Sequence, residues 1–303
     1  MYKEKGIESV QNELEKRFTT LDFWEQYLRN KDTSYGYYES IEFTVVCKPD
    51  LKNLKVFKNN ILSKEKIFES DVMTGKNNGA KNSQGDLKTP LGVYQLVNKL
   101  NHLDPFYGPL AIVTNYPNSY DKVIHNRTGD GIWIHGVPTN NETRDPYTKG
   151  CIALENNNLL SLDRSIRYNN SILIIDNENN ETNQTKYKED IAVILSELYK
   201  WKDSWQSGNY ESYINFYSDQ FKRFDGTDFE AFKKYKKMIF DRNEKKEISF
   251  KDFNITPYPN LEGKKLYKVT YYQNYSTKSV KFNGTKELYL EVLNNSISIL
   301  FEG

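Results

Sequence analysis

The chain has 303 residues, of which 27% are charged, and its formal net charge at pH 7 is only +1. A chain of this length usually forms two or three compact units, and such a balanced charge creates no overall field that would attract nucleic acid or an acidic membrane surface. No run approaches the roughly 18 apolar residues that a membrane helix requires, so we expect neither a nucleic-acid partner nor a membrane span.

Residues 1–38 are predicted to be helical. Apolar residues recur at spacings of three, four or seven and form one stripe, which consists of Ile7, Val10, Leu14, Leu21, Trp24 and Leu28. Thr19 followed by Asp22 has the spacing of a capping box, which predicts a second helix ending near Asn30. A segment this short has little core of its own. Its apolar stripe must therefore pack on the rest of the chain or on a second copy.

Residues 39–178 are predicted to form a mainly β domain. Short strand-like runs are separated by Gly, Pro and Asn, and they read "EFTVVCK", "LKVFK", "GVYQLV", "LAIVTNY", "GIWIHG" and "SILIID". Cys47 falls on the apolar side of the alternating "IEFTVVCK". We therefore interpret Cys47 as a buried core residue in preference to a disulfide partner of Cys151.

The last part of the chain is predicted to be a linker followed by an α+β domain. Residues 179–188 are polar and lack a hydrophobic period. In residues 189–303 the helical runs come first, in "DIAVILSELYKWKDSWQSGNYESYINFYS" and "DFEAFKKYKKMIF". Strand-like runs follow, in "KEISFKDFNIT", "KKLYKVTYYQNYS", "TKELYLEVL" and "SISILFEG". The predicted fold class is therefore multidomain α+β.

The residues that carry chemistry gather in "GDGIWIHGVPTNNETRDPYTKGCIAL", residues 129–154, which holds one of three histidines and one of two cysteines. A cysteine attacks as its thiolate, and a neighbouring imidazole lowers its pKa and shuttles the proton. The alternation in "GIWIHG" predicts a strand with Trp133 and His135 on one face. Gly150 lets the backbone approach a substrate closely, and successive amides at Gly150 and Cys151 can point at a developing oxyanion.

The step from His-Gly to Thr-x-Gly-Cys closely resembles the signature of the L,D-transpeptidase (YkuD-like) catalytic domain. "TGK" at residues 74–76 and "DLKTPLGVYQL" at 86–96 resemble the other typical stretch of that family. The resemblance implies a β-sandwich-like fold without metal or cofactor that acts on peptidoglycan stem peptides. It implies Cys151 as nucleophile, His135 as general base and then acid, and the Gly136 carbonyl as the group that orients the imidazole. The remaining site residues that it implies are Gly150, Lys149, Thr148, Trp133 and Ala153.

Position 153 departs from the family pattern. Many members carry arginine two residues after the cysteine, where this chain has Ala153. Arginine is suited to bidentate recognition of a carboxylate, so its absence changes how the substrate is held. Lys149 is one candidate for the missing positive charge, although it reads equally well as an ordinary solvated loop lysine.

The departure and the flanking segments resemble a narrower group, the L,D-carboxypeptidases that determine cell shape in helical and curved bacteria. This resemblance implies a dimerisation segment at 1–38, a catalytic domain at 39–178, a linker at 179–188 and a nuclear-transport-factor-two-like cone domain at 189–303. We therefore expect a homodimer that removes terminal D-Ala from tetrapeptide stems through a cysteine thioester. The N-terminus has no apolar signal-peptide region. Because peptidoglycan is the expected substrate, we nevertheless expect that a signal peptide has been removed and that the enzyme is periplasmic. An L,D-transpeptidase is the alternative, and a non-catalytic wall-binding scaffold is a more distant one.

Four further signals have simple interpretations. The run from Lys233 to Lys246 predicts a solvated basic helix face, with contact to an anionic wall polymer as the alternative. His102 and His125 lack the spacing for a zinc site with His135 and Cys151. Asn180, Asn183 and Asn254 each lie in an acidic-x-Asn-x-Thr sequon that some bacterial glycosylation systems use. We expect core packing, rather than ligand contacts, from the aromatic residues Trp201, Trp205, Tyr210, Tyr213, Phe216, Tyr217 and Phe221.

Overall fold

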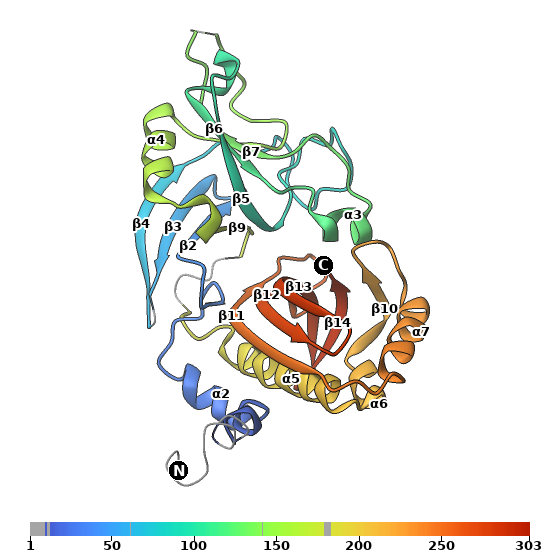
Figure 1. Cartoon of the computed structure of the whole chain (residues 1–303). Coiled ribbons are helices and arrows are strands. Elements are labelled where there is room, and N and C mark those ends of the chain that lie inside the picture. The colour runs from blue at the N-terminus through green and yellow to red at the C-terminus, as the bar shows by residue number, and fades with distance from the viewer. Residues whose placement is uncertain (1–9, 11–12, 61, 141, 179–182) are drawn as a thin grey trace. The chain divides into compact units, whose positions relative to one another are not determined.

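The computed structural model describes residues 10, 13–60, 62–140, 142–178 and 183–303. They fall into two compact units, and each unit contains both helices and strands (Figure 1), which confirms the α+β class. One unit consists of Tyr38–Asn180 and Tyr258–Lys264, and it holds His135 and Cys151. The other contains the N-terminal segment, Glu181–Pro257 and Lys265–Gly303.

The first unit is built on an eight-stranded sheet with the order β4-β3-β2-β9-β5-β6-β7-β8. The pairs β2–β9 and β7–β8 are parallel, and the other neighbours are antiparallel. The strands are β2 (Phe43–Lys48), β3 (Asn53–Asn59), β4 (Lys64–Asp71), β5 (Gly92–Asn101), β6 (Leu110–Thr114), β7 (Trp133–His135), β8 (Ile152–Ala153) and β9 (Ser171–Ile175).

Four short helices complete this unit: η1 (Pro105–Tyr107), α3 (Ser119–His125), α4 (Asn156–Ser165) and η2 (Tyr168–Asn170). Leu159 and Leu162 of α4 join one hydrophobic core with residues from both ends of the sheet, such as Val45 and Ile152. Cys47 lies in this core as a free, fully buried thiol, as its strand pattern predicted.

The sequence did not predict β4 or α4. Charged side chains dominate β4, so its alternation is hidden, and as the edge strand of the sheet it tolerates them because one side faces solvent. The run that forms α4, "NNNLLSLDRS", opens with three asparagines, which favour turns over helix interiors. Burial of Leu159 and Leu162 provides the stabilisation that helix propensity does not.

The second unit packs helices against a six-stranded sheet with the order β1-β11-β12-β13-β14-β10 (Figure 1). Its strands are β1 (Tyr37–Tyr38), β10 (Tyr217–Arg223), β11 (Glu247–Pro257), β12 (Leu266–Ser276), β13 (Lys281–Leu293) and β14 (Ser296–Glu302). Its helices are α2 (Leu21–Leu28), α5 (Lys188–Ser207), α6 (Tyr210–Ile214) and α7 (Phe229–Phe240).

Two sequence predictions in this unit were wrong. The end of the long helical run is strand β10, because Gly208 ends α5 in a left-handed conformation (φ 80°) and α6 stops at Ile214. Tyr217 and Phe221 are four residues apart, a spacing that places side chains on one face of a helix and of a strand alike. The capping box at Thr19 is also absent, since its hydroxyl donates to the Lys16 carbonyl oxygen at 2.7 Å.

The aromatic residues of this unit form its core. Trp201, Tyr213 and Phe221 are at most 1% exposed and lie in one cluster with the sheet residues. Core packing, expected from the sequence, therefore accounts for most of the aromatic set. Trp205 differs, because it also lines a cavity that is described below.

The N-terminal segment packs on helix α5 of the same chain. Trp24 and Leu28 are buried in the core of the second unit, and the Trp24 ring stacks on Tyr199 at 5.8 Å between centroids. Glu15 forms an ion pair of 2.9 Å with Lys202 of α5. Much of the predicted stripe is thus covered within the chain, whereas Leu14 remains 43% exposed and Ile7 lies outside the described residues.

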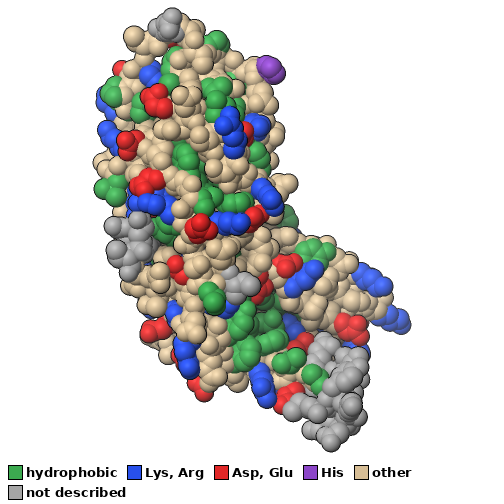
Figure 2. Space-filling model, turned by 90° about the vertical axis from the view of Figure 1, so that its left-hand side faces the viewer, with side chains coloured by type: hydrophobic (Ala, Val, Ile, Leu, Met, Phe, Trp, Pro, Cys, Tyr) green, Lys and Arg blue, Asp and Glu red, His purple; other side chains and the backbone are tan. Residues whose placement is uncertain are grey.

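Figure 2 shows Lys and Arg side chains intermixed with Asp and Glu over the face that it presents, in keeping with the small net charge. No helix in the described ranges is long and apolar enough to cross a membrane. Asn254 is only 6% exposed within β11, so its sequon is inaccessible in the folded protein. Asn183 is exposed, and Asn180 lies outside the described residues.

Candidate active site

The histidine lies in strand β7, and the cysteine directly precedes the neighbouring strand β8. The parallel register of β7 and β8 pairs Ile134 with Ile152 and His135 with Ala153. Ile134 and Ile152 belong to the core, so His135 and Ala153 point to the opposite face. A hydrogen bond from the Trp133 backbone N–H to the Cys151 sulfur holds the cysteine beside β7.

The His135 imidazole is fixed by its own neighbour. Its Nδ1 lies 2.7 Å from the Gly136 carbonyl oxygen, which can only accept, so Nδ1 carries the proton and Nε2 keeps its lone pair. The ring is 2% exposed and the Tyr107 ring covers it edge-on, with 5.2 Å between centroids. Burial lowers the pKa of His135 to about 4, although the bond to Gly136 opposes the shift, and the charge of Arg144 lowers it further.

Gly136 has no room for a side chain. A Cβ atom there would collide with Oδ1 of Asn156 and would lie 3.1 Å from Cα of Gly108. The Asn156 Oδ1 in turn accepts the Val137 N–H at 2.9 Å. The start of α4 therefore fixes the position of the carbonyl that orients His135.

Thr148 and Gly150 form the turn that presents the cysteine. The Thr148 hydroxyl accepts the Gly150 N–H at 3.0 Å and donates to the Cys151 carbonyl oxygen at 2.6 Å. Gly150 has a φ of 134°, and a Cβ there would meet the Lys88 carbonyl oxygen at 2.8 Å. The Cys151 N–H meets no acceptor in the described part of the chain and is available to an oxyanion, whereas the Gly150 N–H is already bonded to Thr148.

The two sequence motifs meet at this turn. Thr148 donates its N–H to the Thr74 carbonyl oxygen at 2.8 Å, and its own carbonyl accepts from Lys76 at 3.2 Å. A buried ion pair of 2.6 Å between Lys81 and Asp86 closes the long loop between the two halves of the upstream motif. The Gly- and Asn-rich segment is therefore an ordered support for Gly150 and Cys151.

Three further residues of the candidate site were not predicted from the sequence. Phe106 and Tyr107 of η1 form an aromatic wall, in which Tyr107 also contacts Trp133 at 5.4 Å between centroids. The Arg144 guanidinium lies over the Phe106 ring at 5.5 Å. All three come from segments outside the family motifs, so only the folded chain brings them to His135.

Burial around Cys151 favours a neutral resting pair. Burial raises the pKa of the Cys151 thiol, while a hydrogen bond from the Trp133 backbone N–H and the charges of Arg144 and Lys81 offset part of the increase. Because the pKa of His135 is low and that of the thiol is high, thiol and imidazole are both neutral at pH 7.

Comparisons with known proteins agree with this geometry. The model of the L,D-transpeptidase catalytic domain, YkuD, matches residues 44–174, and the model of the Cds6 C-terminal NTF2-like domain matches residues 193–303. The crystal structure of the helical cell shape determining protein Pgp2 from Campylobacter jejuni is 39% identical over 94% of this chain and 100% of its own, with a TM-score of 0.86. The chain belongs to the Pgp2 family.

Two further structures support the fold. A single-substitution variant of Pgp2 matches with a TM-score of 0.87, again at 39% identity, over 95% of this chain and 99% of its own. Bd1075 of Bdellovibrio bacteriovorus is 24% identical over 89% of this chain and 96% of its own, with a TM-score of 0.71. No curated protein matches the chain.

Two predicted substrate-binding positions of this Pgp2 family member have unlike surroundings. Ala153 is fully buried, and its backbone exchanges two hydrogen bonds of 2.8 Å with Met73. It therefore supplies space beside His135 but no polar side chain. Lys149 is exposed.

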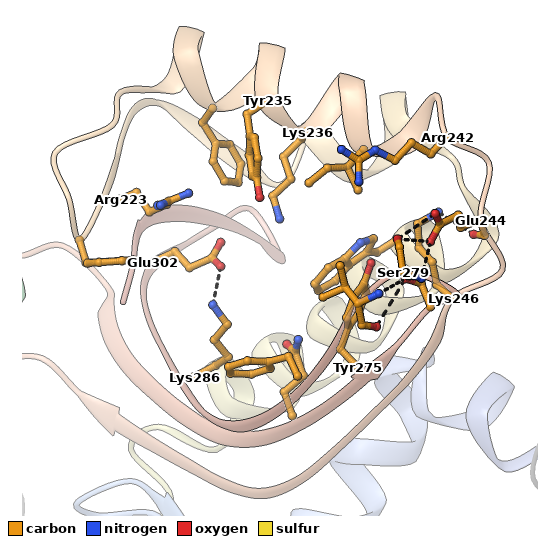
Figure 3. A pocket seen from close by; sticks show the side chains of 18 residues that line it. Arg223, Tyr235, Lys236, Arg242, Glu244, Lys246, Tyr275, Ser279, Lys286 and Glu302 are labelled. Carbon is orange, nitrogen blue, oxygen red and sulfur yellow. Dashed lines mark hydrogen bonds and ion pairs between the residues drawn. The ribbon is translucent and has the colours of Figure 1, made fainter.

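The NTF2-like part of this Pgp2 family member contains a cavity of about 360 Å³. Figure 3 shows Tyr235 and Lys236 reaching into it from α7, opposite Lys286 of β13 and Glu302 of β14, which form an ion pair of 3.0 Å. Neither His135 nor Cys151 lines this cavity. The charged lining residues are Arg223, Lys236, Arg242, Glu244, Lys246, Lys286 and Glu302.

The cavity changes the interpretation of the basic run from Lys233 to Lys246. Lys234 and Lys237 are solvated as predicted, but Lys236 and Lys246 are 7% and 4% exposed and line the cavity with Arg242. Burial lowers the pKa of Lys236 to about 8, although the nearby Glu302 carboxylate opposes that shift. The excess of cations and the aromatic walls suit a small ligand that carries negative charge.

The low pKa of His135 leads to a prediction for the pH dependence of the reaction. We expect kcat/KM to rise with pH as the imidazole loses its proton at about pH 4 and then to stay level through neutral pH. The measurement is a pH–rate profile of tetrapeptide cleavage, with circular dichroism at each pH to show that the protein is folded. An acid limb near the ordinary histidine pKa of about 6.5 would contradict a buried neutral base.

Proposed function

We propose that this protein is a peptidoglycan L,D-carboxypeptidase that removes the terminal D-Ala from tetrapeptide stems and leaves tripeptides. The observation that carries the proposal is that Cys151 lies beside the strand that contains His135, with the Gly136 carbonyl on Nδ1 of the imidazole. The L,D-transpeptidase match supports the substrate class. The whole-chain match to a helical cell shape determining protein supports a role in cell shape.

The proposed reaction has two steps that share one proton carrier. The Cys151 sulfur attacks the carbonyl carbon before the terminal D-Ala, and its proton passes to Nε2 of His135. The oxyanion accepts the Cys151 N–H, the C–N bond breaks, and His135 protonates the departing amine of D-Ala. Water then attacks the thioester as His135 takes its proton, which releases the tripeptide carboxylate and restores the thiol.

An L,D-transpeptidase would form the same thioester and pass it to an amine. Ala153 in place of the usual arginine, together with the accessory segments, supports hydrolysis as the principal outcome. Incubation of purified protein with disaccharide tetrapeptides separates the candidates by chromatography of the products. Tripeptides support the carboxypeptidase, cross-linked dimers the transpeptidase, and unchanged tetrapeptides a wall-binding scaffold, with the Cys151→Ser variant as the blank.

The proposed substrate also sets the proposed location. Peptidoglycan lies outside the inner membrane, so a protein that trims its stems works in the periplasm. Cell fractionation tests this directly. Recovery of the native protein with cytoplasmic markers alone would contradict it.

We also propose that the N-terminal segment joins two copies of the chain. Leu14 and Tyr27 are 43% and 45% exposed in this segment. A second copy would bury these side chains, at roughly 1.5–3 kcal/mol for each large one. The packing of Trp24 and Leu28 on α5 reduces the apolar area that still needs a partner.

Light scattering of the full chain tests the dimer, because deletion of the segment would also expose the core around Trp24. We expect a mass of twice 35.6 kDa for wild type and of one chain for Leu14→Glu. Leu51→Glu is the matched control, since Leu51 is 61% exposed but lies in the other unit. A monomeric wild type at micromolar concentration would exclude the dimer, and a dimeric Leu14→Glu would place the interface elsewhere.

A further inference from the structure

The proposed substrate ends in a carboxylate that any carboxypeptidase of this kind must accommodate. That carboxylate belongs to the residue directly after the scissile bond, so it lies within about one residue length, roughly 4 Å, of the carbonyl that Cys151 attacks. Many L,D-transpeptidases carry an arginine two residues after the cysteine, where this chain has the fully buried Ala153. A cation from another part of the chain therefore has to be sought close to Cys151 and His135.

Arg144 lies between the segments that carry these two residues. Its Nη1 is 3.5 Å from the Gly136 carbonyl oxygen, the same oxygen to which His135 Nδ1 is bonded. Its Nη2 is 3.4 Å from the Tyr147 carbonyl oxygen, on the loop that leads to Cys151. Its charge also lowers the pKa values of both His135 and the Cys151 thiol.

The hydrogen-bonding capacity of the Arg144 guanidinium is largely unused. Both of its contacts are at the long limit for a hydrogen bond. Its Nε is buried without any hydrogen-bond partner, and in the described part of the chain no carboxylate forms an ion pair with it. A half-buried guanidinium whose two Nη contacts are both long retains Nη donors for a bidentate bond to a carboxylate.

The surroundings of Arg144 fix the orientation of its guanidinium. The Phe106 ring lies 5.5 Å from Cζ, and stacking of this kind fixes the plane of a guanidinium without using its N–H donors. Lys149, by contrast, is exposed and has no comparable support. Of the two cations on this loop, Arg144 is the one that the fold positions.

We infer that Arg144 binds the terminal carboxylate of the substrate and takes the place of the arginine that the family carries where this chain has Ala153. The inference rests on the proposed function for the identity of the substrate. It makes Arg144 a specificity-determining residue that selects stems with a free C-terminal D-Ala. The bond is made to the carboxylate and not to the reacting atoms, so its loss affects recognition of one substrate end.

The test compares two substrates, a tetrapeptide stem with a free C-terminal carboxylate and the same stem as its C-terminal amide. Wild type is expected to prefer the acid in kcat/KM by on the order of tenfold to a hundredfold, the usual worth of hydrogen bonds to a charged group. Arg144→Gln should abolish the preference: it should lower kcat/KM for the acid, mainly through KM, and lower kcat/KM for the amide much less. Arg144→Lys should restore part of the preference, since it keeps the charge but not the fork.

Arg164→Gln is the matched control, because Arg164 is an exposed residue of α4 in the same unit. If Arg144 had only a structural role, Arg144→Gln would lower kcat/KM equally for the acid and the amide, and that result would overturn the inference. Three other results would overturn it too: no preference in wild type, an unchanged preference in Arg144→Gln, or loss of the preference in Lys149→Gln instead.

If wild type cleaves neither substrate, the proposed function fails, and the inference is then decided by binding. Calorimetry in the Cys151→Ser background should show that the acid binds more tightly than the amide and that Arg144→Gln removes the difference. Equal binding of acid and amide would overturn the inference independently of the activity.

Discussion

Replacement of Cys151 by serine is expected to lower the rate of tetrapeptide cleavage by on the order of 10⁴-fold or more, because a hydroxyl gives up its proton to a neutral imidazole far less readily than a thiol does. His135→Gln should have a comparable effect, since it removes the base and keeps most of the side-chain volume. Both rates are measured from D-Ala release, and thermal unfolding shows whether the variants keep their fold.

The other cysteine provides the control. Cys47 is fully buried in the core of the same unit, and burial raises the pKa of its thiol well above the ordinary value. Cys47→Ala should therefore keep wild-type activity below its melting temperature, whereas serine at this position would bury an unsatisfied hydroxyl. Wild-type rates in Cys151→Ser, or inactivation in a folded Cys47→Ala, would contradict the assignment of the nucleophile.

Replacement of Gly150 by alanine is expected to reduce kcat/KM by on the order of a hundredfold or more and to lower the melting temperature. A side chain at φ 134° is strained by about 1–3 kcal/mol, and here the added Cβ would also lie 2.8 Å from the Lys88 carbonyl oxygen. The turn must shift to relieve the contact, and Cys151 moves with it. A displacement of about 1 Å at a catalytic group is enough for a hundredfold loss.

Gly129→Ala is the control that separates the effect of backbone strain from the effect of displacing Cys151. Gly129 has nearly the same φ, 135°, but a Cβ there would meet only Cγ of Gln84, at 3.9 Å. We expect this variant to lose stability through strain alone and to keep its activity. Equal activity of the two variants would show that Gly150 is needed only for the fold, and the proposed role of the turn in presenting Cys151 would be wrong.

The sequence predicted those parts of the site that neighbouring residues determine. The alternation of "GIWIHG" was enough to place Trp133 and His135 on one face, and the family motif led to the prediction of Cys151 as nucleophile. Arg144 and Tyr107 could not be found in this way, because their nearness to His135 depends on contacts between loops. The Gly150 N–H shows the same limit, since only the folded turn brings the Thr148 hydroxyl to it.

For the fold, too, local patterns were predictable and features that depend on distant contacts were not. Strands with clear alternation or apolar runs were predicted, whereas β4 was hidden by its charges and α4 by its asparagines. The end of the helical run was ambiguous because a four-residue spacing suits both a helix and a strand. In such segments the pairing partner decides between helix and strand. Here β10 is a strand because it pairs with β14.

The compact unit that holds the catalytic pair also contains Tyr258–Lys264, a loop that the chain reaches only after most of the NTF2-like part has been made. Tyr258 is 5% exposed, and its ring packs on Tyr120 at 5.4 Å between centroids. A boundary drawn after the last strand of the catalytic sheet would therefore cut through a folding unit rather than between two. One buried ring of the unit that holds His135 and Cys151 is therefore encoded more than a hundred residues downstream of them.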